Sequence, residues 1–234
     1  MEYTLKVKPK NPTIIQGFPS FGLVGTIATG FLIDHLNAKP IGEIYGKELP
    51  AMVAVHNKEL IKPLEIFYAK KENIIIINAL LNVSGLEWEI ASTILKLAKE
   101  LKAKEIVIIE GVASPQISEE PLAFYFSPKE NEKFKKKGIS KLNEGVIIGV
   151  TASMLSLAKA TNVNCVFVET HTDLPDSRAA AKAIEVIDKY LGLKVDYKPL
   201  IRKAEEFEER IRKIIEKSKK SAEIAKQKQL SYLG

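Results

Sequence analysis

Four short apolar runs divide the chain into a succession of segments that are predicted to be buried strands. They lie at residues 13–16, 74–77, 105–110 and 164–169, and turn-forming or polar residues bound each of them. The run at 74–77 has no polar alternate, so it should be covered on both faces, as the central strands of α/β sheets are. The pattern therefore predicts a sheet buried between two layers.

Between these runs, apolar residues recur at intervals of three and four, which is the pattern of one face of an α-helix. The segments with this pattern are 23–36, 86–101 and 177–191. Asp176 or Ser177 can cap the last helix, and Gly192 suits its C-terminal stop. The alternation of strands and helices predicts an α/β, three-layer fold with a central, mostly parallel mixed sheet.

Other segments are shorter. The runs at 41–45, 52–56 and 64–68 are separated by turn signals and predict antiparallel pairing within the same sheet. Residues 114–138 contain three prolines and a lysine-rich end, and they predict loops, a short strand at 124–126 and an exposed turn. The stretch 146–157 predicts a strand over 146–150 followed by a helix.

The glycine-rich stretch at residues 17–30 joins the first strand to the first helix. Gly22, Gly25 and Gly30 should each cost the helix about 1 kcal/mol relative to alanine, which indicates that another group approaches its backbone closely. We expect close packing, within the chain or across a subunit interface. The residues assigned to it are Gly17, Phe18, Pro19, Phe21, Gly22 and Gly25.

A phosphate-binding loop is the alternative interpretation of this stretch, and the spacing argues against it. Gly17, Gly22 and Gly25 do not match the G-x-G-x-x-G pattern, and Pro19 has no N–H group to donate. No Lys or Arg lies between positions 10 and 39 to meet a phosphate charge. We therefore expect packing rather than nucleotide binding.

Composition narrows the class of protein. The 234 residues carry a formal net charge of +6 and a single cysteine, Cys165, so an intrachain disulfide framework is excluded. Basic and acidic residues alternate over most of the chain without a nucleic-acid-binding motif. No signal peptide or membrane span is apparent, and the many Lys, Glu and Ile residues suit a thermophile. We expect a cytoplasmic protein without nucleic-acid or membrane partners.

Candidate catalytic residues are few. Ligands of parallel sheets bind at the carboxyl ends of strands, where Glu110 and Glu169 are predicted to lie, with His171 and Asp173 just beyond the latter. These residues match no metal-ligand spacing and no nucleophile motif. We expect no catalysis, no metal and no cofactor. The alternative is a nucleoside- or phosphate-dependent hydrolase or phosphorylase that uses Glu169, His171 and Asp173.

The composition changes near residue 198, which divides the chain into a predicted α/β domain, 1–197, and a C-terminal charged helix with a flexible tail, 198–234. An apolar stripe at heptad-like spacing runs from Ala204 to Ser218. The chain closes with an apolar cluster after a basic spacer. Either the cluster is a frayed end, or it is a docking peptide formed by Leu230, Tyr232, Leu233 and Gly234.

Three segments carry a resemblance to a known family. The run GFPSFGLVGTIATGFLI after the first strand, EGV at 110–112 and ETHTDLPDSRAAA at 169–181 resemble the archaeal branch of the proteasome assembly chaperone family, the proteasome assembly chaperone 2-like group. The similarity covers most of residues 10–195. It implies a nucleoside phosphorylase/hydrolase-like α/β fold without established catalysis.

The resemblance also implies partners. Members of the family are ring- or dimer-forming chaperones that act on proteasome subunits. The implied partners of this chain are thus proteasome subunits of the α-ring, further copies of itself as a homo-oligomer, or a homologue in a hetero-oligomer. Members can carry a C-terminal hydrophobic–Tyr–any tripeptide that docks between α-ring subunits; here Tyr232 is third from the end rather than second.

Overall fold

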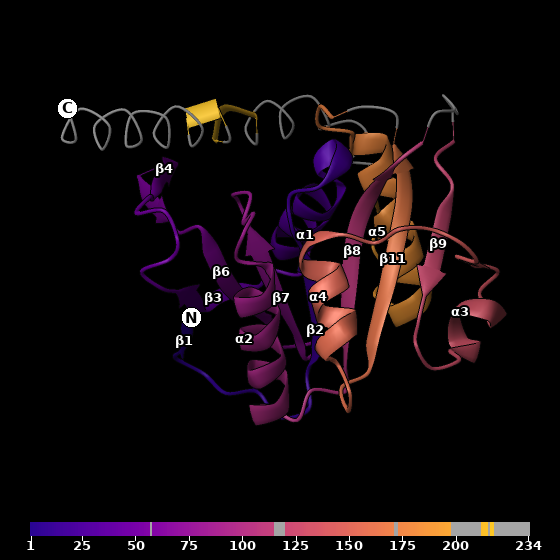
Figure 1. Ribbon diagram of the computed structural model, residues 1–234, viewed down its shortest axis with the longest axis horizontal. Helices are drawn as coiled ribbons and strands as arrows, with labels where there is room; N and C mark the ends of the chain where they lie inside the picture. The colour runs from indigo at the N-terminus through magenta and orange to yellow at the C-terminus, as the bar shows by residue number, and fades with distance from the viewer. Residues whose placement is uncertain (57, 115–119, 171–172, 198–211, 215, 218–234) are drawn as a thin grey trace.

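The computed structural model of the protein describes residues 1–56, 58–114, 120–170, 173–197, 212–214 and 216–217. In this part of the chain one large sheet runs through the middle and helices cover both of its faces (Figure 1). The three-layer α/β fold predicted from the sequence is confirmed.

The sheet contains nine strands within the described residues. Their order across the sheet is β1 (Glu2–Leu5), β3 (Lys39–Tyr45), β6 (Leu64–Ala69), β7 (Ile74–Ala79), β2 (Thr13–Gly17), β8 (Glu105–Ala113), β11 (Val163–Thr170), β9 (Ala123–Phe126) and β10 (Ser140–Lys141). The neighbours β7, β2, β8 and β11 are parallel to one another. On the β1 side the pairs β1–β3, β3–β6 and β6–β7 are antiparallel, as predicted for this region. At the other edge β9 is antiparallel to β11 and parallel to β10.

Two helices cover each face of the sheet. Helices α1 (Val24–His35) and α5 (Ser177–Leu191) lie together on one face, and α2 (Glu87–Glu100) and α4 (Gly149–Leu157) lie together on the other (Figure 1). Side chains of alternate strand residues point to opposite faces of the sheet. Ile15 packs in the core beneath α1 and α5, whereas Ile14 packs in the core beneath α2 and α4. This double burial explains why the central strands have no polar face.

Glycines bring the first helix close to the sheet. A Cβ atom on Gly25 would lie 2.5 Å from the carbonyl oxygen of Ile109 in β8, so no larger residue fits there without movement. Gly22 has φ +62° in the 3₁₀ turn η1 (Phe21–Leu23), a conformation that other residues rarely adopt. The glycine-rich stretch thus packs against the sheet of its own chain.

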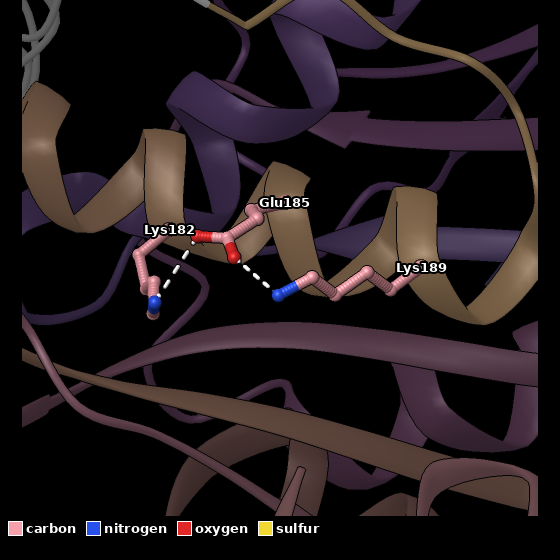
Figure 2. A network of polar contacts seen from close by, with 3 residues as sticks. All are labelled: Lys182, Glu185 and Lys189. Carbon is pink, nitrogen blue, oxygen red and sulfur yellow. Dashed lines mark hydrogen bonds and ion pairs between the residues drawn. The ribbon is translucent and has the colours of Figure 1, made fainter. Parts of the chain in front are cut away.

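Helix α5 begins and ends where its sequence predicts. The Asp176 side chain accepts a hydrogen bond from the Ala179 N–H at 3.0 Å, and Gly192 ends the helix with φ +74°. On the outer side of the helix, Glu185 lies between Lys182 and Lys189 and forms an ion pair with each (Figure 2). Burial acts to raise the pKa of Glu185, but hydrogen bonds from Lys189 and Lys182 outweigh it and lower that pKa.

The structure corrects the strand predicted at residues 146–150. Residues 146–148 form no strand, and helix α4 begins at Gly149. Both sides of β11 are already occupied, by β8 and β9, and Gly149 with φ +73° turns the chain directly into α4. The apolar residues at 146 and 148 therefore lie outside the sheet.

The lysine-rich segment predicted as an exposed turn contains a short helix, α3 (Glu132–Lys136). Its Phe134 is 0% exposed and stacks against Tyr125 and Tyr190, with ring centroids 4.8 and 3.9 Å away. One aromatic residue among lysines produces no helical periodicity, so the pattern could not reveal this anchor.

Smaller differences lie at the edges of the fold. Strand β1 was not predicted, and β8 continues to Ala113, beyond the expected end at Glu110. The run at 52–56 contains only the short strand β4 (Ala54–His56), which forms a separate hairpin with β5 (Glu59–Ile61). The described helices include none that is long and apolar enough to cross a membrane.

Little of the C-terminal region falls within the described residues. Arg212–Ile214 and Glu216–Lys217 are helical, in agreement with the predicted charged helix. Arg212 Nε lies 3.9 Å from Glu216 Oε1, one turn along this helix. The remaining stripe positions and the predicted partner-binding residues Leu230, Tyr232, Leu233 and Gly234 lie outside the described residues.

Candidate functional site

A cavity of about 1000 Å³, here called the strand-end cavity, lies at the carboxyl ends of the central parallel strands. Segments that follow β2 and β7 form one side of it, the last residues of β8 and β11 form its base, and the residues leading into α4 form another side. Strand β2 lies between β7 and β8, and the chain crosses from β7 to β8 over α2. In α/β sheets a binding crevice forms at a point where the chain changes sides in this way. The fold thus supplies a cavity at the position expected for a ligand or partner.

Glu110 is a partly buried acidic residue of this cavity. It lies on β8 and accepts a hydrogen bond from the Thr151 hydroxyl of α4. Burial raises the pKa of Glu110 to about 7, although the Thr151 hydrogen bond acts in the opposite direction. Near neutral pH the carboxyl group can therefore both donate and accept hydrogen bonds.

Cys165 is the buried neighbour of Glu110 on the same face of the sheet. Its side chain is 0% exposed on β11. Burial, together with the nearby charge of Glu110, raises the pKa of the Cys165 thiol well above its ordinary value. A thiol that is buried and protonated is a poor nucleophile, so Cys165 is a packing residue.

The ionisable residues that line the cavity within the described part of the chain are all acidic. They are Glu87, Glu110, Glu144, Glu169 and Asp173. The sequence predicted a cluster at the strand ends, and the structure places Glu110, Glu169 and Asp173 on one cavity; His171 lies outside the described residues. These lining residues would repel a phosphate group, and none of them is a cation that could bind it.

Exposed apolar side chains stand at the mouth of the cavity. Val146 is 92% exposed, Ile148 is 63% exposed and Phe21 is 42% exposed, and all three line the cavity. Of the glycine-rich stretch, Pro19 and Phe21 line the cavity as well, while Phe18 packs against the core beneath α2 and α4. Of the six residues that were expected to pack closely, Pro19 and Phe21 thus form part of the cavity wall.

Gly22 and Gly111 fix the position of the turn after β2, which forms part of the cavity wall. A Cβ atom on Gly111 would lie 2.0 Å from the carbonyl oxygen of Phe21, and the Gly111 N–H donates to Ser20 Oγ at 3.1 Å. Gly22 sits against Thr170 and Asp176, whose side chains are joined by a hydrogen bond of 2.8 Å. The turn after β2 is therefore fixed to both β8 and the start of α5.

Sequence reasoning missed two acidic residues of the cavity, one at the start of helix α2 and one in the segment before α4. Glu87 and Glu144 come from segments that the strand pattern does not connect with the sheet edge. The apolar residues 146–148 between Gly145 and Gly149 were a usable signal, because two glycines flanking an apolar run can also mark an exposed binding loop.

A model of the PAC2 family matches residues 14–215 of this sequence. The chain belongs to the PAC2 family. The predicted resemblance to proteasome assembly chaperone homologues is thereby confirmed, and the match extends over the covering helices and over the sheet apart from β1.

Solved structures of the family share this fold. Pyrococcus furiosus PbaA, described as an archaeal homolog of proteasome-assembly chaperone, is 30% identical with a TM-score of 0.83, and the match covers 94% of this chain and 99% of PbaA. Pyrococcus furiosus PbaB, described as an archaeal proteasome activator, is 25% identical with a TM-score of 0.76 and coverage of 91% and 97%. An uncharacterised protein of Methanocaldococcus jannaschii is 26% identical over 99% of this chain and 97% of its own length.

Proposed function

We propose that this chain is a non-enzymatic, chaperone-like protein that binds proteasome subunits. The observation that carries the proposal is the likeness to PbaA, which extends over almost the full length of both chains. Strands β7, β8 and β11, which bear the strand-end cavity, lie within the residues matched by the family model.

The chemistry of the cavity agrees with protein binding. Exposed apolar side chains at its mouth, including Val146 and Ile148, are the kind of surface that a partner protein covers. The described residues contain no group of three or more His, Cys, Asp or Glu side chains placed to hold a metal ion.

The finer parts of the proposal concern the partner and the assembly. The partner is an α-ring subunit of the proteasome, and the chain acts as a homo-oligomer, or as a hetero-oligomer with a homologue, in the cytoplasm. Leu230, Tyr232, Leu233 and Gly234 dock on the ring from the end of the charged tail. A Leu–Ser–Tyr–Leu sequence after a basic spacer suits insertion into a pocket between subunits.

The experiment mixes the full chain with separately produced archaeal proteasome α and β subunits. We expect a complex with α subunits by light scattering and faster formation of assembled particles on native gels. An elution volume unchanged by α subunits, together with an unchanged rate of particle formation, would refute the proposal.

The tail is tested separately by a double variant, Tyr232→Ala with Leu233→Ala, and by Ser231→Ala as the matched control in the same segment. We expect the double variant to lose co-sedimentation with assembled particles and the control to retain it. If both bind like the parent chain, the tail has no docking role, and the chaperone-like function then rests on the folded domain.

A second candidate is a nucleoside- or phosphate-dependent enzyme on the same fold. The raised pKa of Glu110 favours it, because a carboxyl group that titrates near pH 7 is suited to proton transfer. Glu169 and Asp173 line the same cavity. A thermal-shift screen with nucleosides, nucleotides and phosphate tests this candidate; stabilisation by a nucleoside that Glu110→Gln abolishes would support it.

A further inference from the structure

The segment leading into α4 has an unusual exposure pattern. Val146 and Ile148 are 92% and 63% exposed, while Ile147 between them packs against the core beneath α2 and α4. Ile148 has extended backbone angles, and in an extended segment alternate side chains point in opposite directions. Ile147 therefore anchors the segment, and its two apolar neighbours face solvent.

The segment is held in that orientation at both ends. The Leu142 N–H donates to the Tyr125 carbonyl of β9 at 2.8 Å, and Leu142 packs against the same core as Ile147. Helix α4 begins at Gly149 and places Thr151 against Glu110. Exposure of Val146 and Ile148 is thus built into the fold, and on the far side of the cavity Phe21 adds a third exposed apolar group.

The charge inside the cavity contrasts with that of the whole chain. The formal net charge of the chain is +6, yet the described lining contains five carboxylates and no Lys, Arg or His. Glu144 and Asp173 are exposed, while Glu87, Glu110 and Glu169 are partly buried, so the negative potential extends from the mouth into the interior. Low-dielectric walls between these groups focus that potential.

A ligand that satisfies both features must combine apolar groups with positive charge. An acidic or phosphorylated ligand would be repelled, and a neutral apolar ligand would leave the carboxylates desolvated without a partner. A compact inorganic cation would leave the apolar mouth uncovered. The cavity volume of about 1000 Å³ suits several side chains rather than one small ion.

We propose that the strand-end cavity is a docking site for a segment of a partner protein in which Lys or Arg alternates with apolar residues. The apolar side chains of the segment cover Val146, Ile148 and Phe21, and its cationic groups reach Glu144 and Glu169. The site differs in place and in chemistry from the C-terminal tail, and it does not depend on the partner being a proteasome subunit.

The test uses the full chain and a fluorescently labelled, amidated peptide that alternates Lys with Ile. Two matched peptides replace either every Lys with Glu or every Ile with Ser. By fluorescence anisotropy we expect binding of the Lys–Ile peptide only, and weakening between about 50 mM and about 500 mM salt because added ions screen the carboxylates. Equal binding of the Glu–Ile peptide would overturn the proposal.

Variants locate the site. Ile148→Ser, and Glu144→Gln combined with Glu169→Gln, should each weaken the Lys–Ile peptide about tenfold or more. The matched controls are Val55→Ser on the β4–β5 hairpin, where Val55 is 70% exposed, and Glu130→Gln in an exposed loop; neither should change affinity. These surface changes leave the core intact, and equal melting temperatures verify this. Loss of binding in the controls but not in the cavity variants would refute the site.

Two further measurements exclude other occupants. Spermidine that displaces the labelled peptide at comparable concentrations would show that a free amine suffices, and would overturn the peptide assignment. A peptide of residues 221–234 of this chain contains Lys226, Lys228 and a Leu–Tyr–Leu cluster. If that peptide binds more tightly than the Lys–Ile peptide, the occupant is the C-terminal tail of this protein rather than another protein, and the proposal is overturned.

Discussion

A Cβ atom on Gly17 would lie 2.1 Å from the carbonyl oxygen of Gly25, so the end of β2 and the first turn of α1 meet backbone to backbone. Gly25 in turn faces the carbonyl oxygen of Ile109 on β8. This contact sets the distance between α1 and the sheet, and with it the position of the wall that Pro19 and Phe21 contribute to the strand-end cavity.

Substitution of Gly25 should therefore destabilise the fold. Gly25→Ala places a methyl group 2.5 Å from a backbone atom, and we expect a loss of about 1–3 kcal/mol of unfolding free energy. Gly25→Leu should prevent folding or assembly. The matched control is Gly145→Ala, because the nearest atom to its Cβ would be a flexible Leu142 methyl group at 3.6 Å. Urea unfolding measures both, and equal midpoints for Gly25→Ala and the parent would contradict the packing role.

Glu110 should make stability depend on pH. Its pKa is raised from 4.5 to about 7 in the folded protein, so between these values the folded state binds a proton that the unfolded chain has released. The free energy of unfolding then falls as pH rises through this window. We expect Glu110→Gln to be more stable than the parent by about 1–3 kcal/mol at pH 8 and nearly equal to it at pH 4.5.

The measurement for Glu110 is a series of urea unfolding curves across the pH window. Glu130→Gln, in an exposed loop, serves as the control and should keep the parent's pH profile. Parallel profiles for Glu110→Gln and the parent would show that the folded pKa of Glu110 is ordinary.

Phe134 should contribute strongly to the free energy of unfolding, although it lies in a lysine-rich segment. It is 0% exposed and stacks between Tyr125 and Tyr190. Phe134→Ala should cost about 3–5 kcal/mol, as removal of a buried aromatic ring does. Phe21→Ala is the matched control; its ring is 42% exposed and should cost much less. Thermal unfolding by circular dichroism compares the two, and similar losses would contradict the anchoring role of α3.

The start of α5 offers a capping test. Asp176 accepts hydrogen bonds from the Ala179 N–H and from the Thr170 hydroxyl, so Asp176→Ala should cost about 1–2 kcal/mol. Asp173→Ala, three residues earlier and exposed, should have little effect on stability. Because Gly22 packs against Asp176, the Asp176 variant should also expose the turn after β2 to faster proteolysis. Unchanged stability and proteolysis would argue against this coupling.

The sequence predicted the centre of the molecule better than its periphery. Strands β2, β7, β8 and β11 were identifiable because both of their faces are buried, which leaves continuous apolar runs. Residues 146–150 have the same composition for a different reason, since Val146 and Ile148 are exposed at the cavity mouth. Hydrophobicity alone does not distinguish a covered strand from an apolar binding loop.

The candidate site was predicted only in part. Strand order brings Glu110 and Glu169 to one edge of the sheet, and that follows from the α/β pattern. Glu87 and Glu144 reach the cavity through the packing of α2 and of the segment before α4, and no local pattern encodes that placement. The predicted tail residues, from Leu230 onward, stay predictions.

The borders of the sheet bear on how copies of this chain can associate. Strand β10, which closes one side, contains only Ser140 and Lys141, and both are exposed. Strand β1 closes the other side with four residues. Backbone pairing at β10 could extend over two residues at most, and Lys141 would be brought against the incoming strand. The sheet therefore cannot be continued far from the β10 edge of one copy into a second copy, which makes open-ended fibrous growth through that edge unfavourable.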